Sequence, residues 1–185
     1  MANGPSSPEP AGPPSETVSL VHAAREGDRA AFAELYVRYV RMVHGILIAR
    51  APRLDVDDLV QDVFLHAMRR MSSLRDASAF GGWLAAIARN RVSDYLRRAR
   101  PMDPLPDFDD LAADDSGELD ATAVLKLLRT LPEAYRETLA MRLIEGMTGP
   151  EIAAATGLTA ASVRVNLHRG MKLLRERLDG RSVRE

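Results

Sequence analysis

Residues 147–178 read MTGPEIAAATGLTAASVRVNLHRGMKLLRERL and predict two helices joined by a tight turn. Thr148 and Glu151 stand three residues apart at the start of an apolar run, which is the spacing of a capping box. Gly157 suits the left-handed turn that ends the first helix, and Thr159 can cap a longer second helix. A short helix, a glycine turn and a longer amphipathic helix form a helix-turn-helix.

The second helix of such a motif enters the major groove of DNA, where its N-terminal side chains meet base edges. Arg164 is the best single base reader, because a guanidinium can pair bidentately with guanine. Arg169 and Lys172 lie further along and suit phosphate contacts. An ordinary helical hairpin with a solvated basic face is the alternative for this stretch. The candidate contacts are Thr159, Ala161, Ser162, Arg164, Val165, His168, Arg169 and Lys172.

The rest of the chain also follows a helical period, and the 185 residues predict an all-α protein. The absence of cysteine excludes disulfides and thiolate metal sites. No apolar run reaches the roughly 18 residues of a membrane span, and the N-terminus lacks the basic-then-apolar pattern of a signal peptide. We therefore expect a cytoplasmic protein without a membrane span.

Charge divides the chain into blocks. Residues 101–120 hold eight acidic residues and no basic one, whereas the residues before and after them carry a small basic excess. This pattern predicts two small helical domains joined by a flexible acidic linker, which would let the domains move independently. The expected parts are a disordered tail at 1–15, an N-terminal helical domain at 16–100, the linker at 101–119 and the helix-turn-helix domain at 120–180.

Residues 55–71, DVDDLVQDVFLHAMRRM, predict a helix with two unlike sides. The stripe formed by Val56, Val60 and Val63 is apolar and should face the core. The opposite side frames a leucine with carboxylates and an amide, which is the composition of a partner-binding surface. That face consists of Asp57, Asp58, Gln61, Asp62 and Leu65.

The aspartates allow two other interpretations. Asp55 as N-cap, with the next aspartates in the first turn, would stabilise the helix start, and this role is compatible with a partner surface. A metal site would need Asp58, Asp62 and His66 to converge on one ion. These three residues span more than two turns, so no metal and no cofactor is expected.

A further helix is expected from about Trp83 to Arg100, preceded by a polar loop that the Gly81–Gly82 pair should loosen. Such a loop can hold an unstacked base, and arginines along the helix can follow a phosphate backbone. Packing against neighbouring helices is the commoner role for a residue like Trp83. The candidate residues are Arg75, Asp76, Ser78, Trp83, Asn90, Arg91, Arg97 and Arg98.

These blocks together resemble a known family. DVDDLVQDVFLHAMRRM is similar to region 2.2 of bacterial RNA polymerase sigma factors of the extracytoplasmic-function (ECF) group. FGGWLAAIARNRVSDYLRRAR resembles their regions 2.3 and 2.4, and residues 131–178 resemble region 4. The resemblance covers residues 19–179, and the order and separation of the blocks make it specific.

The resemblance implies a role for each surface. The aspartate face would dock on the core RNA polymerase, with Asp58, Gln61 and Asp62 meeting basic residues and Leu65 as apolar anchor. The loop and the tryptophan helix would capture the single-stranded −10 element of promoter DNA, and the helix-turn-helix would read the double-stranded −35 element. The linker would lie in a basic channel of the polymerase. An anti-sigma factor is an expected partner.

Two other classes of function are alternatives to a sigma factor. A stand-alone helix-turn-helix transcriptional regulator would need a sensor or dimerisation domain in the first 100 residues, where we find an acidic face and a basic helix instead. A metal-dependent enzyme would need a ligand set or catalytic motif, and none is present in the sequence. We therefore expect a protein that is not an enzyme.

Overall fold

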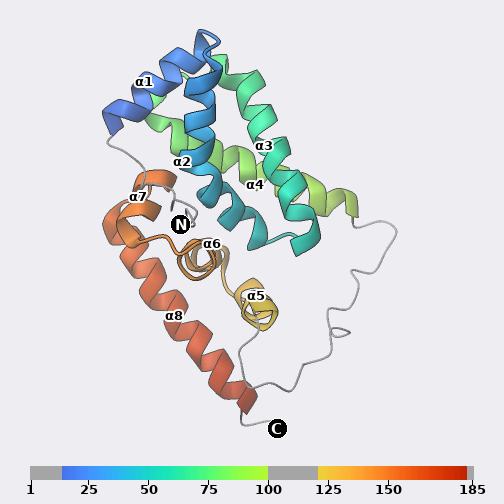
Figure 1. Cartoon of the computed structure of the whole chain (residues 1–185). Coiled ribbons are helices and arrows are strands. Elements are labelled where there is room, and N and C mark those ends of the chain that lie inside the picture. The colour runs from blue at the N-terminus through green and yellow to red at the C-terminus, as the bar shows by residue number, and fades with distance from the viewer. Residues whose placement is uncertain (1–13, 100–120, 183–185) are drawn as a thin grey trace, which may run out of the picture.

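The computed structural model describes residues 14–99 and 121–182, and within these ranges all regular structure is helical. Figure 1 shows the helices as two groups. The predicted all-α fold of two small domains is therefore confirmed. The predicted linker and most of the predicted tail lie outside the described residues.

The first domain contains four α-helices whose starts and ends follow local signals. Asp28 caps α2 by accepting hydrogen bonds from the backbone amides of Ala30 and Ala31 at 2.8 and 3.1 Å. Gly27, with φ of 95°, provides the turn between the first two helices. The helices are α1 (Pro14–Arg25), α2 (Arg29–Ile48), α3 (Val56–Arg70) and α4 (Phe80–Ala99).

Two sequence predictions for this domain were wrong. The side chain of Asp55 makes no cap hydrogen bond to α3, because a short 3-10 helix, Arg53–Asp55, leads directly into it. The Asp55 carboxylate instead accepts a 2.7 Å hydrogen bond from the Tyr95 hydroxyl, which raises the pKa of Tyr95 to about 12. Helix α4 also begins three residues earlier than expected, so Gly81 and Gly82 lie in its first turn.

The second domain contains α5 (Ala121–Arg129), α6 (Glu133–Leu143), α7 (Gly149–Thr156) and α8 (Ala160–Ser182). The capping box of Thr148 and Glu151 is present at the start of α7. Gly157 has φ of 74° and ends α7 in the left-handed conformation. The predicted helix-turn-helix is therefore confirmed in its helices and in its turn.

The two domains pack against each other. Helix α2 contacts α6 and α7, and α4 contacts α7. Figure 1 shows α6, almost end-on, beside the lower half of α2. Met141, Ile152 and Ala155 of the second domain join the same buried apolar cluster as Met42 and Leu84 of the first. The sequence predicts domains that move independently, whereas the structure gives them a common core.

Close packing of α8 on α6 depends on Gly170, which is buried. A β-carbon at this position would lie 2.9 Å from Leu139 Cδ1 and 3.1 Å from Tyr135 Cβ. Leu139 is fully buried, so it has little room to move away. Gly170 thus sets the distance between α8 and α6 where the two helices cross.

We predict that Gly170→Val destabilises the protein by about 1–3 kcal/mol, the usual effect of overpacking a core. Urea unfolding of the full chain, followed by circular dichroism, measures this change. Arg175→Val, at an exposed position of the same helix, controls for the effect of a β-branched residue on helix stability. Equal losses of stability in the two variants would contradict the packing role of Gly170.

Candidate functional site

The first surface is the acidic face of α3, formed by Asp57, Asp58, Gln61, Asp62 and Leu65. All five residues are exposed. The opposite side of the helix is buried, and Phe64 packs there against the Tyr36 ring at a centroid distance of 4.5 Å. The predicted division of this helix into a core side and a solvent side is therefore confirmed.

The acidic face presents a broad apolar centre. Leu65 is 46% exposed, and Met68, one turn further along α3, is 50% exposed. Met68 was not among the candidates, although its place at the margin of the polar side was visible in the sequence. A groove continues from the face onto α2, where Asp57 and Gln61 share it with Tyr36 and His44, and Glu145 of the second domain lines its other side.

His66 has a different environment from the acidic residues near it in sequence. Its Nδ1 lies 3.1 Å from a guanidinium nitrogen of Arg91 on α4, so the imidazole can accept a hydrogen bond there. Desolvation, followed by the charge of Arg91, lowers the pKa of His66 below its ordinary 6.5. In residues 14–99 and 121–182, no group of three or more histidine, aspartate or glutamate side chains is arranged to hold a metal ion.

The second surface comprises the loop before α4 and one side of α4. Asp76 accepts hydrogen bonds from the backbone amide of Ser78 at 2.9 Å and from its hydroxyl at 2.7 Å, and this lowers the pKa of Asp76. The pair shapes the loop by capping a short 3-10 helix, Ala77–Ala79. Arg75 is exposed beside it.

Trp83 connects this loop to the core. It is half-buried and stacks at a tilt on Phe80, with ring centroids 5.8 Å apart. One side of α4 then carries the exposed Asn90, Arg97 and Arg98, and Arg97 pairs with Asp94. The candidates from Trp83 to Arg98 therefore form a strip of roughly 20 Å along the helix.

The third surface is the N-terminal half of α8. Thr159 accepts a hydrogen bond from the Ser162 amide at 3.1 Å, and their hydroxyl oxygens lie 2.8 Å apart. These two residues therefore fix the start of the helix. Val163 is buried, which turns the neighbouring positions outward. The exposed candidates are Ala161, Arg164, Val165, His168, Arg169 and Lys172.

The contact between the domains contains charged residues that the sequence did not single out. Glu137 of α6 is 5% exposed and accepts a bidentate pair from Arg89 of α4, with N–O distances of 2.8 to 3.2 Å. Arg50 lies 3.1 Å from the same carboxylate. Each partner lies more than 40 residues away in the sequence, so no local pattern indicates these pairs.

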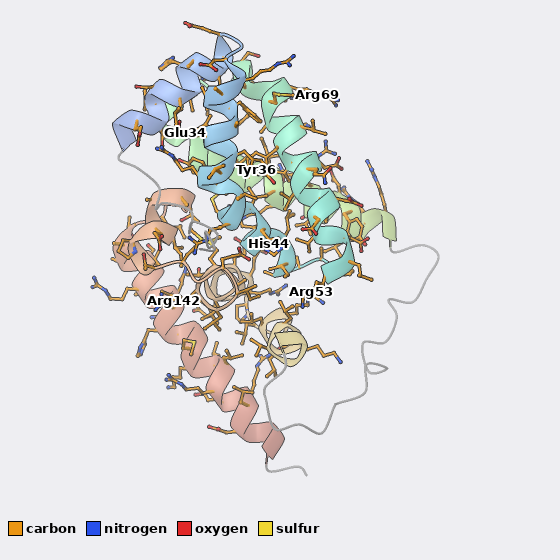
Figure 2. All side chains as sticks on the ribbon, viewed as in Figure 1. Glu34, Tyr36, His44, Arg53, Arg69 and Arg142 are labelled. Atoms are coloured by element: carbon orange, nitrogen blue, oxygen red, sulfur yellow. The ribbon has the colours of Figure 1, made fainter. Side chains whose placement is uncertain are left out.

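His44 forms a second polar contact between the domains. Its Nδ1 lies 2.6 Å from a carboxylate oxygen of Glu145, and the neighbouring Arg41 donates to the Glu145 backbone carbonyl at 3.1 Å. Figure 2 shows His44 on the lower part of α2, where that helix approaches α6. The hydrogen bond that His44 donates to the Glu145 carboxylate raises the pKa of His44 above 6.5, although burial opposes the shift.

Comparison with known proteins matches both domains to one family. Residues 35–101 match the family model for Sigma-70 region 2, and residues 121–174 match that for Sigma-70, region 4. The chain is 31% identical over 172 residues to the ECF RNA polymerase sigma-E factor of Escherichia coli K12, covering 84% of this chain and 90% of that protein. It is 33% identical over 162 residues to the RNA polymerase sigma factor CarQ of Myxococcus xanthus, covering 83% and 92%.

Solved structures show the same architecture. CnrH, in complex with the cytosolic domain of CnrY, superposes with a TM-score of 0.59 and 28% identity, over 89% of this chain and 98% of CnrH. The sigma factor RpoE of Bartonella quintana, crystallised with the anti-sigma factor NepR, gives a TM-score of 0.53 at 22% identity, over 80% and 96% of the two chains.

The chain therefore belongs to the ECF group of RNA polymerase sigma factors. It binds core RNA polymerase, directs it to promoters and helps to melt the −10 element. The stand-alone regulator that the sequence left as an alternative is excluded. Between residues 14 and 182, with 100–120 set aside, no helix has both the length and the apolar character needed to cross a membrane.

The opposite pKa shifts of two histidines provide a test of the domain contact. We predict that His44 titrates above pH 6.5 and His66 below it. Because the pKa of His44 is raised in the packed form, its contribution to the contact is complete below about pH 6.5 and is lost as the pH rises through the raised value. Nuclear magnetic resonance of the imidazole C–H groups measures both values.

Glu145→Gln should lower the pKa of His44, because burial then acts without the partner carboxylate. The same substitution should leave the pKa of His66 unchanged, since that residue faces Arg91. An unchanged His44 pKa in this variant would show that the 2.6 Å contact is not present in solution.

Proposed function

We propose that the acidic face of α3 is the docking surface for core RNA polymerase. An exposed leucine within a ring of carboxylates suits a basic partner surface with an apolar pocket. Met68 extends the apolar area, and Asp57 and Gln61 connect it to the groove on α2. The single observation that carries this role is that Leu65 is 46% exposed on a helix whose other side is fully packed.

We predict that Asp62→Lys and Leu65→Asp together weaken binding to core polymerase by 30-fold or more, since loss of a central anchor costs about 2 kcal/mol or more. The binding of fluorescently labelled protein to purified core enzyme measures the change. Run-off transcription from the promoter of the protein's own gene should fall in parallel.

Matched controls lie elsewhere on the surface. Glu34→Lys reverses an exposed charge on α2, and Leu143→Asp alters a leucine that is 43% exposed on α6. Neither belongs to the acidic face, so each should bind core polymerase as the unaltered protein does. If the controls lose as much affinity as the double variant, the effect is not specific to α3. That result would refute the assigned docking surface.

The loop 72–79 and the exposed strip of α4 are proposed to hold the single-stranded −10 element. Arg75 and Ser78 lie on the loop, Trp83 closes its end, and Asn90, Arg91, Arg97 and Arg98 continue along the helix. Melting then follows from differential binding, because a surface that binds only unpaired bases shifts the equilibrium toward open DNA. This mechanism needs no catalytic residue, and we propose that the protein is not an enzyme.

The exposed start of α8 is proposed to read the −35 element. Ala161 and Val165 allow close approach to the groove, and Arg164 is placed to reach a guanine edge. Arg169 and Lys172 lie one to two turns further on, where they suit phosphates. The hydrogen bonds between Thr159 and Ser162 hold the first turn of α8 in place. They thereby fix the direction in which these side chains point.

We predict that Arg164→Ala reduces the preference for the cognate −35 sequence by roughly 5- to 150-fold, the range for a lost base contact of about 1–3 kcal/mol. Arg169→Ala should weaken binding to cognate and scrambled DNA alike and reduce the salt slope by about one. Fluorescence anisotropy at several salt concentrations separates the two effects. Equal behaviour of the two variants would contradict the division into base and phosphate contacts.

We also propose an anti-sigma factor as a partner and the cytoplasm, where the transcription machinery lies, as the site of action. The support for a partner is that the Bartonella sigma factor was solved with the anti-sigma factor NepR, and CnrH with the cytosolic domain of CnrY. Co-purification of a neighbouring gene product with this chain, and inhibition of run-off transcription by it, test the proposal. A product that binds but leaves transcription unchanged would be a different kind of partner.

A further inference from the structure

The contact between the two domains relies on two glycines where the helices meet. A β-carbon at Gly81 of α4 would lie 2.1 Å from the backbone oxygen of Ala155 of α7, a distance that no side chain tolerates. A β-carbon at Gly45 of α2 would lie 2.8 Å from Met141 Cγ on α6. The backbone of Gly81 therefore contacts the backbone of α7, and the backbone of Gly45 contacts a side chain of α6. Packing this close is typical of a protein interior.

Charge is complementary across the same contact. The first domain contributes basic groups from α2, the segment after it and α4, and the second contributes carboxylates from α6 and α7 and the turn between them. Glu137, which pairs with two arginines, is almost fully buried, so its charge depends on those partners. In the opposite direction, Arg129 donates to the carbonyl oxygens of Ile48 and Ala51 at the end of α2. The facing groups are Arg41, His44, Arg50 and Arg89 on one side and Glu133, Glu137, Glu145 and Glu151 on the other.

This arrangement brings the two proposed DNA surfaces too close together for a promoter. Gly81 touches Ala155, Ser78 precedes Gly81 by three residues, and Ser162 follows Ala155 by seven. Since a chain spans at most about 3.6 Å per residue, Ser78 and Ser162 lie within roughly 40 Å of each other. The −10 and −35 elements are separated by roughly 25 base pairs, or about 85 Å of duplex.

We propose that the packed arrangement is an autoinhibited state that this chain forms by itself, and that the domains must separate before both promoter elements can be bound. The inference rests on the proposed function of the two DNA surfaces. The two domains act as each other's inhibitor, because the contact is complementary in shape and charge with no other chain present. The apparent affinity for a promoter is then reduced by the fraction of molecules that are open.

A disulfide staple tests whether closure inhibits. A β-carbon at Gly45 would be 3.4 Å from Met141 Cα and 2.8 Å from its Cγ, so the two β-carbons come within the 3.5–4.5 Å that a disulfide spans. The chain has no cysteine of its own, so Gly45→Cys with Met141→Cys can form only this bond within one molecule. The oxidised variant should fail to direct run-off transcription by core polymerase, and dithiothreitol should restore it.

A glycine pair tests whether the closed state is populated without a staple. Gly81→Ala clashes with Ala155, whereas a β-carbon at the adjacent Gly82 would lie at an ordinary 3.6 Å from the oxygen of Thr156. Both substitutions raise helix propensity equally. Overpacking of this kind shifts an equilibrium by roughly 5- to 150-fold, so Gly81→Ala should open the protein and Gly82→Ala should not. Small-angle X-ray scattering of the free chain should show a larger radius of gyration only for Gly81→Ala.

A second opening variant avoids any change inside the first domain. A β-carbon at Gly81 also lies 3.0 Å from the Tyr39 ring, so a loss of stability alone would not report on domain opening. Glu145→Lys places a cation beside Arg41 and His44 and leaves α4 untouched. It should increase the radius of gyration as Gly81→Ala does, and it should bind promoter DNA more tightly than the unaltered chain. Binding to core polymerase is not a readout for this variant, because Glu145 lines the groove beside Asp57 and Gln61.

Each outcome counts for or against the inference. A stapled protein that transcribes as well as its reduced form would overturn autoinhibition. Two results together would show that the closed state is not populated. The cysteine pair would fail to oxidise, and Gly81→Ala and Gly82→Ala would give identical scattering. If the unaltered and reduced chains both fail to transcribe, the proposed function fails instead, because scattering and disulfide formation report on closure without polymerase.

Discussion

Burial of helix α2 is the constraint on which the rest of the structure depends. From Met42 to Ala49 only His44 escapes full burial, so this half of the helix is apolar on all sides. A helix of that kind must be covered by other helices on every side. Helices α1, α3 and α4 of the first domain cover only part of its surface. Helices α6 and α7 of the second domain supply the remaining cover. The closed arrangement therefore follows from an apolar surface that the first domain cannot bury alone.

Polar groups determine how that cover is oriented. Apolar burial is non-directional, and it would permit α6 to cross α2 in several ways. The bidentate pair between Arg89 and Glu137 and the contact between His44 and Glu145 fix one crossing, because each requires particular atoms to meet. A buried charge pair contributes little net stability, and breaking it by removing one partner is costly. A specific contact of this kind fits the proposed autoinhibition, in which the domains separate before both promoter elements are bound.

Local packing determines which side chains each proposed binding surface exposes. On α3, burial of Val56, Val60 and Val63 leaves the carboxylates and Leu65 in solvent. On α8, burial of Val163 and Gly170 does the same for Arg164 and its neighbours. The side chains that pack thus decide which side chains are offered to a partner.

The sequence by itself determined the helices, the helix-turn-helix, the acidic face and the family, because these depend on residues within a few turns of each other. The Asp28 cap, the capping box at Thr148 and the left-handed Gly157 were all predictable from local spacing. The Asp55 cap was not, since Tyr95 takes that carboxylate from 40 residues away. The roles of individual surface residues remain predictions.

Only the tertiary structure decided what the glycines and the charged pairs do. From the sequence, Gly81 and Gly82 are expected to loosen a loop. In the structure they lie in α4, against which α7 packs. Glu137 and His44 resemble ordinary helix residues until the second domain is brought onto the first. The physical reason is the same in each case. The energy of these groups comes from contacts between atoms that are distant in sequence, and no local period, cap or propensity carries information about them.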